Sequence, residues 1–232
     1  MDMIRCCRRT IARIAYGEKN HLHPRETFRM SKSSRKNWPA DVDPKSGMRL
    51  PIPAREALDE TGREAFDRAS APGASIAGLQ GPGGISLYTP KLGLMQSAVN
   101  RYLRYEADFS PRIRETAILI TAREMDSQFE WVAHEGVGLK EGVPQAVIDV
   151  IKHRRPTTGL EATDAYIIDL GRELWRDHKV KPETFAKGKS LFGSQRLVEL
   201  VMLMGNYAGT AALLALVDMQ LHEGHEPLLP IP

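Results

Sequence analysis

The chain has 232 residues, enough for one large domain or two small ones, with the 42% hydrophobic and 26% charged content typical of globular proteins. No run approaches the roughly 20 apolar residues that cross a bilayer, so a membrane partner is not expected. Residues 1–37 hold ten of the 32 Lys and Arg but only three of the 29 Asp and Glu. The rest of the chain is therefore mildly acidic, which argues against nucleic-acid binding.

The basic segment 1–37 has three interpretations: a misassigned start with Met30 as the true first residue, an Arg-rich transit peptide, or a disordered arm. We expect truncation at Met30 to leave the fold unchanged. Cys6 and Cys7 lie in this segment and match neither a CxxC nor a zinc spacing. Without a secretory signal, a cytoplasmic location is expected. We divide the chain into an N-terminal extension, 1–50, and a helical domain, 51–232.

The domain pattern predicts helices joined by short turns. Residues 37–53 are Pro-rich and predict an extended arm, and the Gly/Pro-rich stretch at 70–86 predicts a loop. Thr89-Pro90 and Ser110-Pro111 are typical helix starts. The expected helices span 54–69, 90 to about 106, 111–124, 127–140, a short segment after 144, 161–178, a short segment after 182, and 194–220. No segment alternates with period two, so we predict an all-α single domain of seven or eight helices.

The segment Arg114 to Glu135 carries the densest chemistry. Glu130 and His134 are four residues apart and share one helix face, and Ser127 lies three residues before Glu130 on the same stripe. Glu115 lies in the preceding helix, which a short connection folds back antiparallel. Two carboxylates and an imidazole are therefore expected to converge near the margin of a partly buried helix. Taken alone, a Glu-x-x-x-His pair is more often a solvated or capping pair.

From Pro51 to about Gln220 the chain resembles the carboxymuconolactone decarboxylase family, which includes the alkylhydroperoxidase AhpD group. The string Arg-Glu-(x)11-Ser-x-x-Glu-x-x-x-His occupies the place of that group's Glu-(x)11-Cys-x-x-Cys-x-x-x-His. In this resemblance Glu115 matches the relay glutamate and His134 the relay histidine. Ser127 and Glu130 match the two cysteines. The Leu-Val-Glu-Leu-Val segment with Tyr207 is similar to the family's late core helix.

The missing thiols exclude a two-cysteine peroxidase cycle, because that chemistry needs a thiolate. The glutamate before the histidine is similar to the cysteine-free members grouped with the lactone decarboxylases. The resemblance therefore implies an AhpD-like helical bundle that acts without a cofactor. It also implies a small-molecule substrate, a carboxylated lactone or an intermediate of aromatic-compound catabolism, and a homo-oligomer, trimeric or hexameric.

In such an acid/base lyase, His134 would stabilise an oxyanion, and Glu130 or Glu115 would deliver a proton to carbon. Arginine is expected to hold a substrate carboxylate, because its planar fork fits that group. The expected substrate-binding residues are Ser127, Trp131, Arg114, Arg123 and Tyr207.

Three alternatives stay open. One is a non-catalytic member whose pocket stores a ligand or supports an assembly, and another is an alkylhydroperoxidase-like protein without peroxidase thiols. The third is a metal site on Glu115, Glu130 and His134, which offer oxygen and nitrogen ligands. No metal is expected, because the family's thiol positions are not a metal-binding set.

Overall fold

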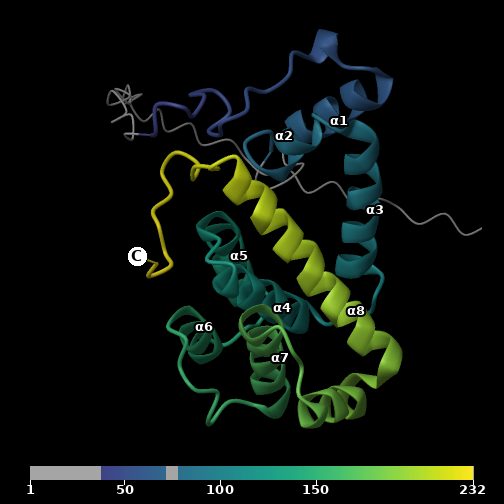
Figure 1. Ribbon diagram of the computed structural model, residues 1–232, viewed down its shortest axis with the longest axis vertical. Coiled ribbons are helices and arrows are strands. Elements are labelled where there is room, and N and C mark those ends of the chain that lie inside the picture. Colours follow the sequence, from purple (N-terminus) through teal and green to yellow (C-terminus); the bar gives the residue numbers. More distant parts are fainter. Residues whose placement is uncertain (1–37, 72–77, 232) are drawn as a thin grey trace, which may run out of the picture. The chain divides into compact units, whose positions relative to one another are not determined.

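The computed structural model describes residues 38–71 and 78–231 (Figure 1). Within these ranges the chain is all-α, as predicted, with an isolated antiparallel bridge between Asp43 and Met48 and no strand. The segment 1–37, with its two cysteines, lies outside the described residues. The helices are α1 (Glu60–Ser70), α2 (Pro82–Ser86), α3 (Pro90–Tyr105), α4 (Pro111–Glu124), α5 (Gln128–Lys140), α6 (Gln145–Lys152), α7 (Ala162–Arg172) and α8 (Pro182–Leu216), with a 3-10 turn η1 (Arg55–Ala57) and a π-helical turn η2 (Glu173–Asp177).

The proline-marked helix starts are confirmed. Pro90 and Pro111 stand in the first turn of α3 and α4, where a missing backbone N–H has no cost. Ser110 caps α4, because its Oγ accepts a hydrogen bond from Ile113 N at 3.3 Å.

The first helix and the following loop differ from the prediction. α1 begins at Glu60, later than expected, because Asp59 is its N-cap and accepts from Gly62 N at 2.8 Å. The stretch 70–86, expected to be a loop, contains the short helix α2. A five-residue helix is too short for a periodic pattern to reveal it.

Helix α4 lies at the centre of the core. Its residues 114–123 are all buried, because α5, α6, α7 and α8 pack around it (Figure 1). A helix covered on every side buries its charged residues as well as its apolar ones. Arg114, Glu115 and Arg123 are consequently buried and require partners inside the protein.

Helix α8 bends at Gly193, whose φ of 73° and ψ of 172° are not helical. The bend is the junction between the two helices predicted after Pro182 and from Ser194. The sequence was expected to contain no stretch apolar enough to cross a membrane. Judged only by length and composition, however, α8 is long and apolar enough to do so. The core helix of a soluble protein can have the same length and composition, and α8 buries one face against α4.

The segment 38–50 packs on the helices. Met48 is fully buried, and Arg49 N donates to Val217 O at 2.7 Å. This segment, predicted to be part of the N-terminal extension 1–50, therefore contacts the helices that follow it.

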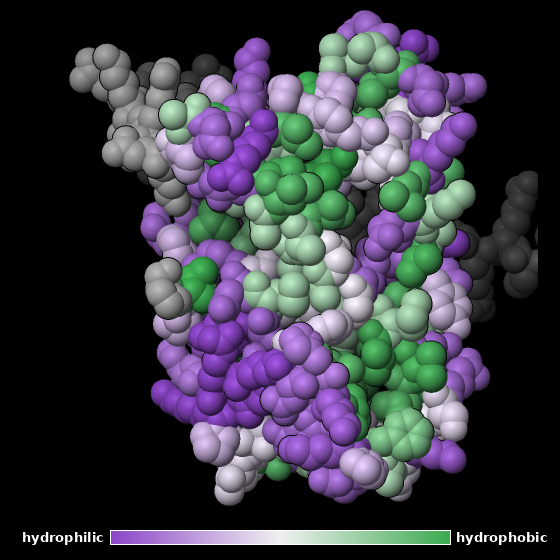
Figure 2. Space-filling view, viewed as in Figure 1, coloured by the Kyte–Doolittle hydropathy of each residue, from purple (hydrophilic) through white to green (hydrophobic). Residues whose placement is uncertain are grey.

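The outer sides of α3 and α8 form an apolar surface, which Figure 2 shows as green patches along both helices. A groove of about 360 Å³ lies where the two helices meet, lined by Ala98, Val99, Tyr102, Leu103, Glu199 and Met202. We call this surface the apolar α3/α8 face. The exposed large apolar residues of α3 and α8 include Leu92, Leu94, Met95, Val99, Tyr102, Val198, Met202, Leu213 and Leu216, of which Val99, Tyr102 and Met202 line the groove.

Candidate functional site

His134 lies between two glutamates. Its Nδ1 is 2.7 Å from Glu115 Oε2, and its Nε2 is 3.6 Å from Glu130 Oε2. Glu130 and His134 share a face of α5 at i,i+4 spacing, and the short connection at 125–127 folds this face back onto α4. The structure thus brings together the three residues predicted to be catalytic.

These three residues were expected near the margin of a partly buried helix. In the structure they are buried instead. The exposed fraction is 0% for Glu115, 5% for Glu130 and 5% for His134. The difference arises because α4 is covered on all sides, so the face of α5 that packs on it is covered too. In such a place each ionised group must be stabilised by a neighbour.

The surroundings of the two carboxyl groups shift their pKa values in opposite directions. Burial alone would raise the pKa of Glu115. Its hydrogen bond to His134, with the nearby guanidinium groups of Arg104 and Arg114, outweighs burial and holds this pKa below the ordinary 4.5. Burial raises the pKa of Glu130 above 4.5. Glu115 is therefore the more readily ionised of the two carboxyl groups, and Glu130 keeps its proton to a higher pH.

Two arginines and a tyrosine flank Glu115. Arg114 Nε lies 3.3 Å and Arg104 Nη2 lies 3.6 Å from Glu115 Oε1. The ring centroid of Tyr105 is 5.3 Å from the guanidinium carbon of Arg104 and 5.6 Å from that of Arg114. Arg104 and Tyr105 were missed from the sequence. Their only signal is their place in the last turn of α3, just before the turn into α4.

Tyr207 of α8 packs on the imidazole. The rings of Tyr207 and His134 meet edge to face, with centroids 5.3 Å apart and an interplanar angle of 87°. Burial raises the pKa of Tyr207 well above its ordinary 10.0, so the hydroxyl keeps its proton at neutral pH. Of the predicted substrate-binding residues, Tyr207 and Arg114 lie at the cluster.

The other three predicted substrate-binding residues are Trp131, Ser127 and Arg123. Trp131 and Arg123 contact other groups of the fold, and Ser127 stands at a helix start. Trp131 is fully buried, and its Nε1 donates to Glu135 Oε2 at 3.0 Å. Ser127 is the N-cap residue of α5, one turn before Glu130. Arg123 is eight residues beyond Glu115 on α4, or about 12 Å along the helix axis.

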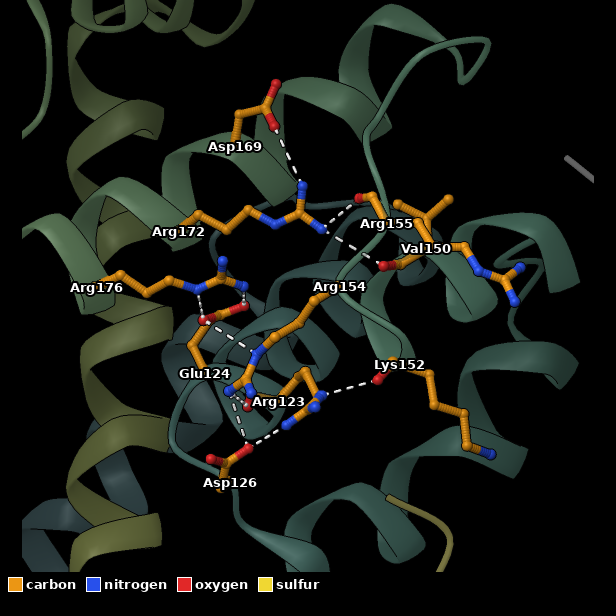
Figure 3. Close-up of polar contacts among 10 residues, drawn as sticks. All are labelled: Arg123, Glu124, Asp126, Val150, Lys152, Arg154, Arg155, Asp169, Arg172 and Arg176. Atoms are coloured by element: carbon orange, nitrogen blue, oxygen red, sulfur yellow. Dashed lines mark hydrogen bonds and ion pairs between the residues drawn. The ribbon is translucent and has the colours of Figure 1, made fainter. Parts of the chain in front are cut away.

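Arg123 belongs to a second charged cluster, at the C-terminal end of α4 (Figure 3). Its Nε donates to Lys152 O at 2.8 Å, and its Nη1 pairs with Asp126. Arg154 Nη2 in turn donates to Arg123 O at 3.1 Å. These guanidinium groups satisfy carbonyls at the ends of α4 and α6, where the helix dipoles are negative.

Arg172 and Arg176, also drawn in Figure 3, likewise pair with groups of the fold. Arg172 Nη2 donates to Arg155 O at 2.8 Å, and Arg176 forms a two-point ion pair with Glu124. The donors of this cluster are thus directed at helix carboxyl ends and at acidic side chains of the fold. We interpret the cluster as structural.

Among the residues described, no group of three His, Cys, Asp or Glu side chains is placed to hold a metal ion. Glu115 and Glu130 approach different nitrogens of His134, on opposite edges of its ring. The geometry therefore does not favour the metal alternative.

Comparison with known proteins assigns no family. No protein-family model matches the sequence, and no curated protein matches it. The resemblance to the carboxymuconolactone decarboxylases therefore stays a prediction, and the function has to be argued from the array of Glu115, His134 and Glu130.

Proposed function

We propose that this protein is an acid/base lyase of the cysteine-free carboxymuconolactone decarboxylase type, acting on a small carboxylated lactone or a related intermediate. The observation that supports it best is the buried Glu115–His134–Glu130 array. One imidazole contacts a carboxyl group that favours ionisation and another that favours its proton. Carboxyl groups whose surroundings push their pKa values apart are a common basis for acid/base roles.

The contacts suggest how the array would work. Ionised Glu115 is an acceptor only, so its 2.7 Å contact requires the proton on Nδ1 of His134. In the neutral imidazole Nε2 is then an acceptor that faces Glu130, and it can exchange a proton with that acid. In this scheme Glu115 orients the imidazole, and Glu130 is the proton donor.

In the proposed reaction the C–C bond to the substrate carboxylate breaks and CO2 leaves. The electron pair of that bond passes into the conjugated lactone carbonyl and forms an enolate. Glu130 delivers its proton to carbon, and Glu130 regains a proton from solvent through His134. Tyr207, which keeps its hydroxyl proton, is the neighbouring neutral donor for the enolate oxygen.

The test is a double-mutant cycle. A panel of carboxylated γ-lactones is assayed for CO2 release and ring opening with wild type, His134→Gln, Glu130→Gln and the double variant. We expect each single change to lower turnover about 100-fold or more, as for loss of general acid/base catalysis. The double variant should be little worse, because residues acting as one unit are non-additive.

His153→Gln, at the exposed C-cap of α6, is the control and should keep wild-type turnover. Melting curves of all the variants separate lost catalysis from lost folding. Full turnover in His134→Gln would contradict the catalytic proposal.

The closed surroundings of the array favour one second candidate, a non-catalytic member. Glu115, Glu130 and His134 are all buried, and buried ionic groups sometimes serve only to specify packing. In that case His134→Gln lowers the melting temperature, and no member of the lactone panel is turned over.

A further inference from the structure

Arg104 lies at the solvent-facing edge of the buried array. Its side chain is 20% exposed, compared with 10% for Arg114 and 0% for Glu115. The adjacent Tyr105 is 66% exposed, and its ring lies over both guanidinium groups. Of the two arginines that contact Glu115, Arg104 is therefore the one that solvent reaches more easily.

Arg104 also has hydrogen-bonding capacity that the fold does not use. Its Nε is buried and has no hydrogen-bond partner within the described part of the chain. Its Nη2 lies 3.6 Å from Glu115 Oε1, which is too long for a hydrogen bond. A buried N–H without a partner is uncommon in folded proteins, so this donor is a candidate for binding a ligand.

The charge around Arg104 is not balanced. Arg104 Nη2 and Arg114 Nε both approach the same carboxylate oxygen, Glu115 Oε1, at 3.6 Å and 3.3 Å. Two guanidinium groups beside one carboxylate leave one positive charge without a partner. An anionic group on a ligand would compensate that charge.

We propose that Arg104 binds the carboxylate of the substrate through Nε and one Nη, with the Tyr105 ring covering the pair. This inference rests on the proposed function and assigns the specificity-determining residue of the same site. A planar guanidinium edge matches a carboxylate in two parallel hydrogen bonds.

The two arginines predicted from the sequence are less suited to this role. Arg114 already uses Nε on Glu115 Oε1 at 3.3 Å and Nη1 on Arg104 O at 2.9 Å. Arg123 uses its donors in the second cluster, on Lys152 O and Asp126. Arg104 is the flanking arginine with a buried donor left over.

The experiment compares one anion with its neutral analogue. Isothermal titration calorimetry on the full chain measures binding of 5-oxotetrahydrofuran-2-carboxylate and of its primary amide. The variants are Arg104→Met, Arg104→Lys and, as a matched control, Arg101→Met. Arg101 is exposed, lies one turn earlier on α3 and pairs with Glu106 at 3.5 Å, outside the array.

We expect wild type to prefer the carboxylate. Arg104→Met should weaken carboxylate binding about 10- to 100-fold, the effect of losing a charged hydrogen bond, and leave amide binding within about twofold. Arg104→Lys should fall between, because an ammonium group keeps the charge but loses the two-point geometry. Arg101→Met should match wild type.

Two outcomes overturn the inference: wild type that does not prefer the carboxylate, or Arg104→Met and Arg104→Lys that leave the preference unchanged. If Arg104→Met fails to fold, the ratio of carboxylate to amide affinity in Arg104→Lys decides alone.

The failure of the proposed function can be told apart from the failure of this inference. Arg104-dependent carboxylate binding with unaltered turnover in His134→Gln would keep the anchor and remove the acid/base role. If His134→Gln loses turnover and Arg104→Met affects both probes equally, the acid/base role stands and the carboxylate anchor is removed.

Discussion

Glu115 and Glu130 are the same amino acid in one buried array, yet their surroundings shift their pKa values in opposite directions. Glu115 contacts His134 at 2.7 Å and has two guanidinium groups beside it, whereas Glu130 has a single 3.6 Å contact with the imidazole. When both groups are buried, the number and closeness of opposite charges decide which carboxyl group ionises. The difference predicts two distinct pH dependences of stability.

Glu115 has a folded pKa below 4.5, so its contribution to stability is present above pH 4.5 and is lost as pH falls through the folded pKa. Glu130 has a folded pKa above 4.5, so its contribution is full below pH 4.5 and is lost as pH rises through the folded value. Glu115→Gln should reduce the pH dependence of the free energy of unfolding below pH 4.5. Glu130→Gln should reduce that dependence above pH 4.5. A tenfold difference in acidity between the folded and unfolded chain changes the free energy of unfolding by about 1.4 kcal/mol.

Urea unfolding of wild type and both variants between about pH 3 and 9 checks these slopes. Glu223→Gln, an exposed position in the C-terminal segment, is the control. Slopes that change in the same direction in both variants would show that the two carboxyl groups do not differ as the contacts imply.

Local spacing explains which site residues could be predicted. Glu130 and His134 follow from the i,i+4 rule, and Glu115 follows from a short connection between two helices. Arg104 has no such relation, because α3 and α4 are separate elements and only tertiary packing places it beside Glu115. Trp131 was predicted to bind substrate, but its indole Nε1 donates to Glu135 within the fold.

At the scale of elements, starts were easier to predict than burial. Pro90 and Pro111 stand in the first turns of α3 and α4, and Ser110 also caps α4 with a side-chain hydrogen bond, so the local sequence reveals both starts. The cover on each side of a helix is a tertiary property. α4 is buried all round, whereas the periodic apolar stripe of α3 is largely exposed, with Leu103 its one fully buried large residue.

Close approach of α7 to α4 predicts a sensitive glycine. A Cβ at Gly171 would lie 2.7 Å from Ile120 Cγ1 and 3.0 Å from its Cγ2. Ile120 is fully buried and β-branched, so it has little freedom to move. We expect Gly171→Ala to lower the free energy of unfolding by about 1–3 kcal/mol, as overpacking does.

Gly136→Ala on α5 is the matched control, because nothing lies within 4 Å of its added Cβ. Here the alanine should raise the free energy of unfolding by about 0.5–1 kcal/mol through helix propensity. Denaturant unfolding of both variants provides the measurement. A stabilising Gly171→Ala would show that α4 and α7 separate more easily than their contact suggests.

At the scale of the whole molecule, the apolar α3/α8 face stands out. Monomeric proteins rarely expose a large contiguous apolar patch, and this face joins residues of two helices across a groove. We propose that a second copy of the chain covers it in a homo-oligomer, a trimer or hexamer by the family resemblance. The apolar residues of α3 are exposed in the single chain, and such an assembly would bury them.

Met202, exposed beside this groove, offers the test of assembly. Light scattering after gel filtration should give wild type a mass of about three or six times the 25.9 kDa of one chain. Met202→Lys should raise the dissociation constant about 10-fold or more, because a buried, unpaired ammonium group opposes association. Leu139→Lys, at an exposed apolar position on α5, is the control and should leave the mass unchanged. A monomeric wild type would contradict the proposal, and assembly only in the presence of detergent or lipid would instead favour a membrane-facing role for α8.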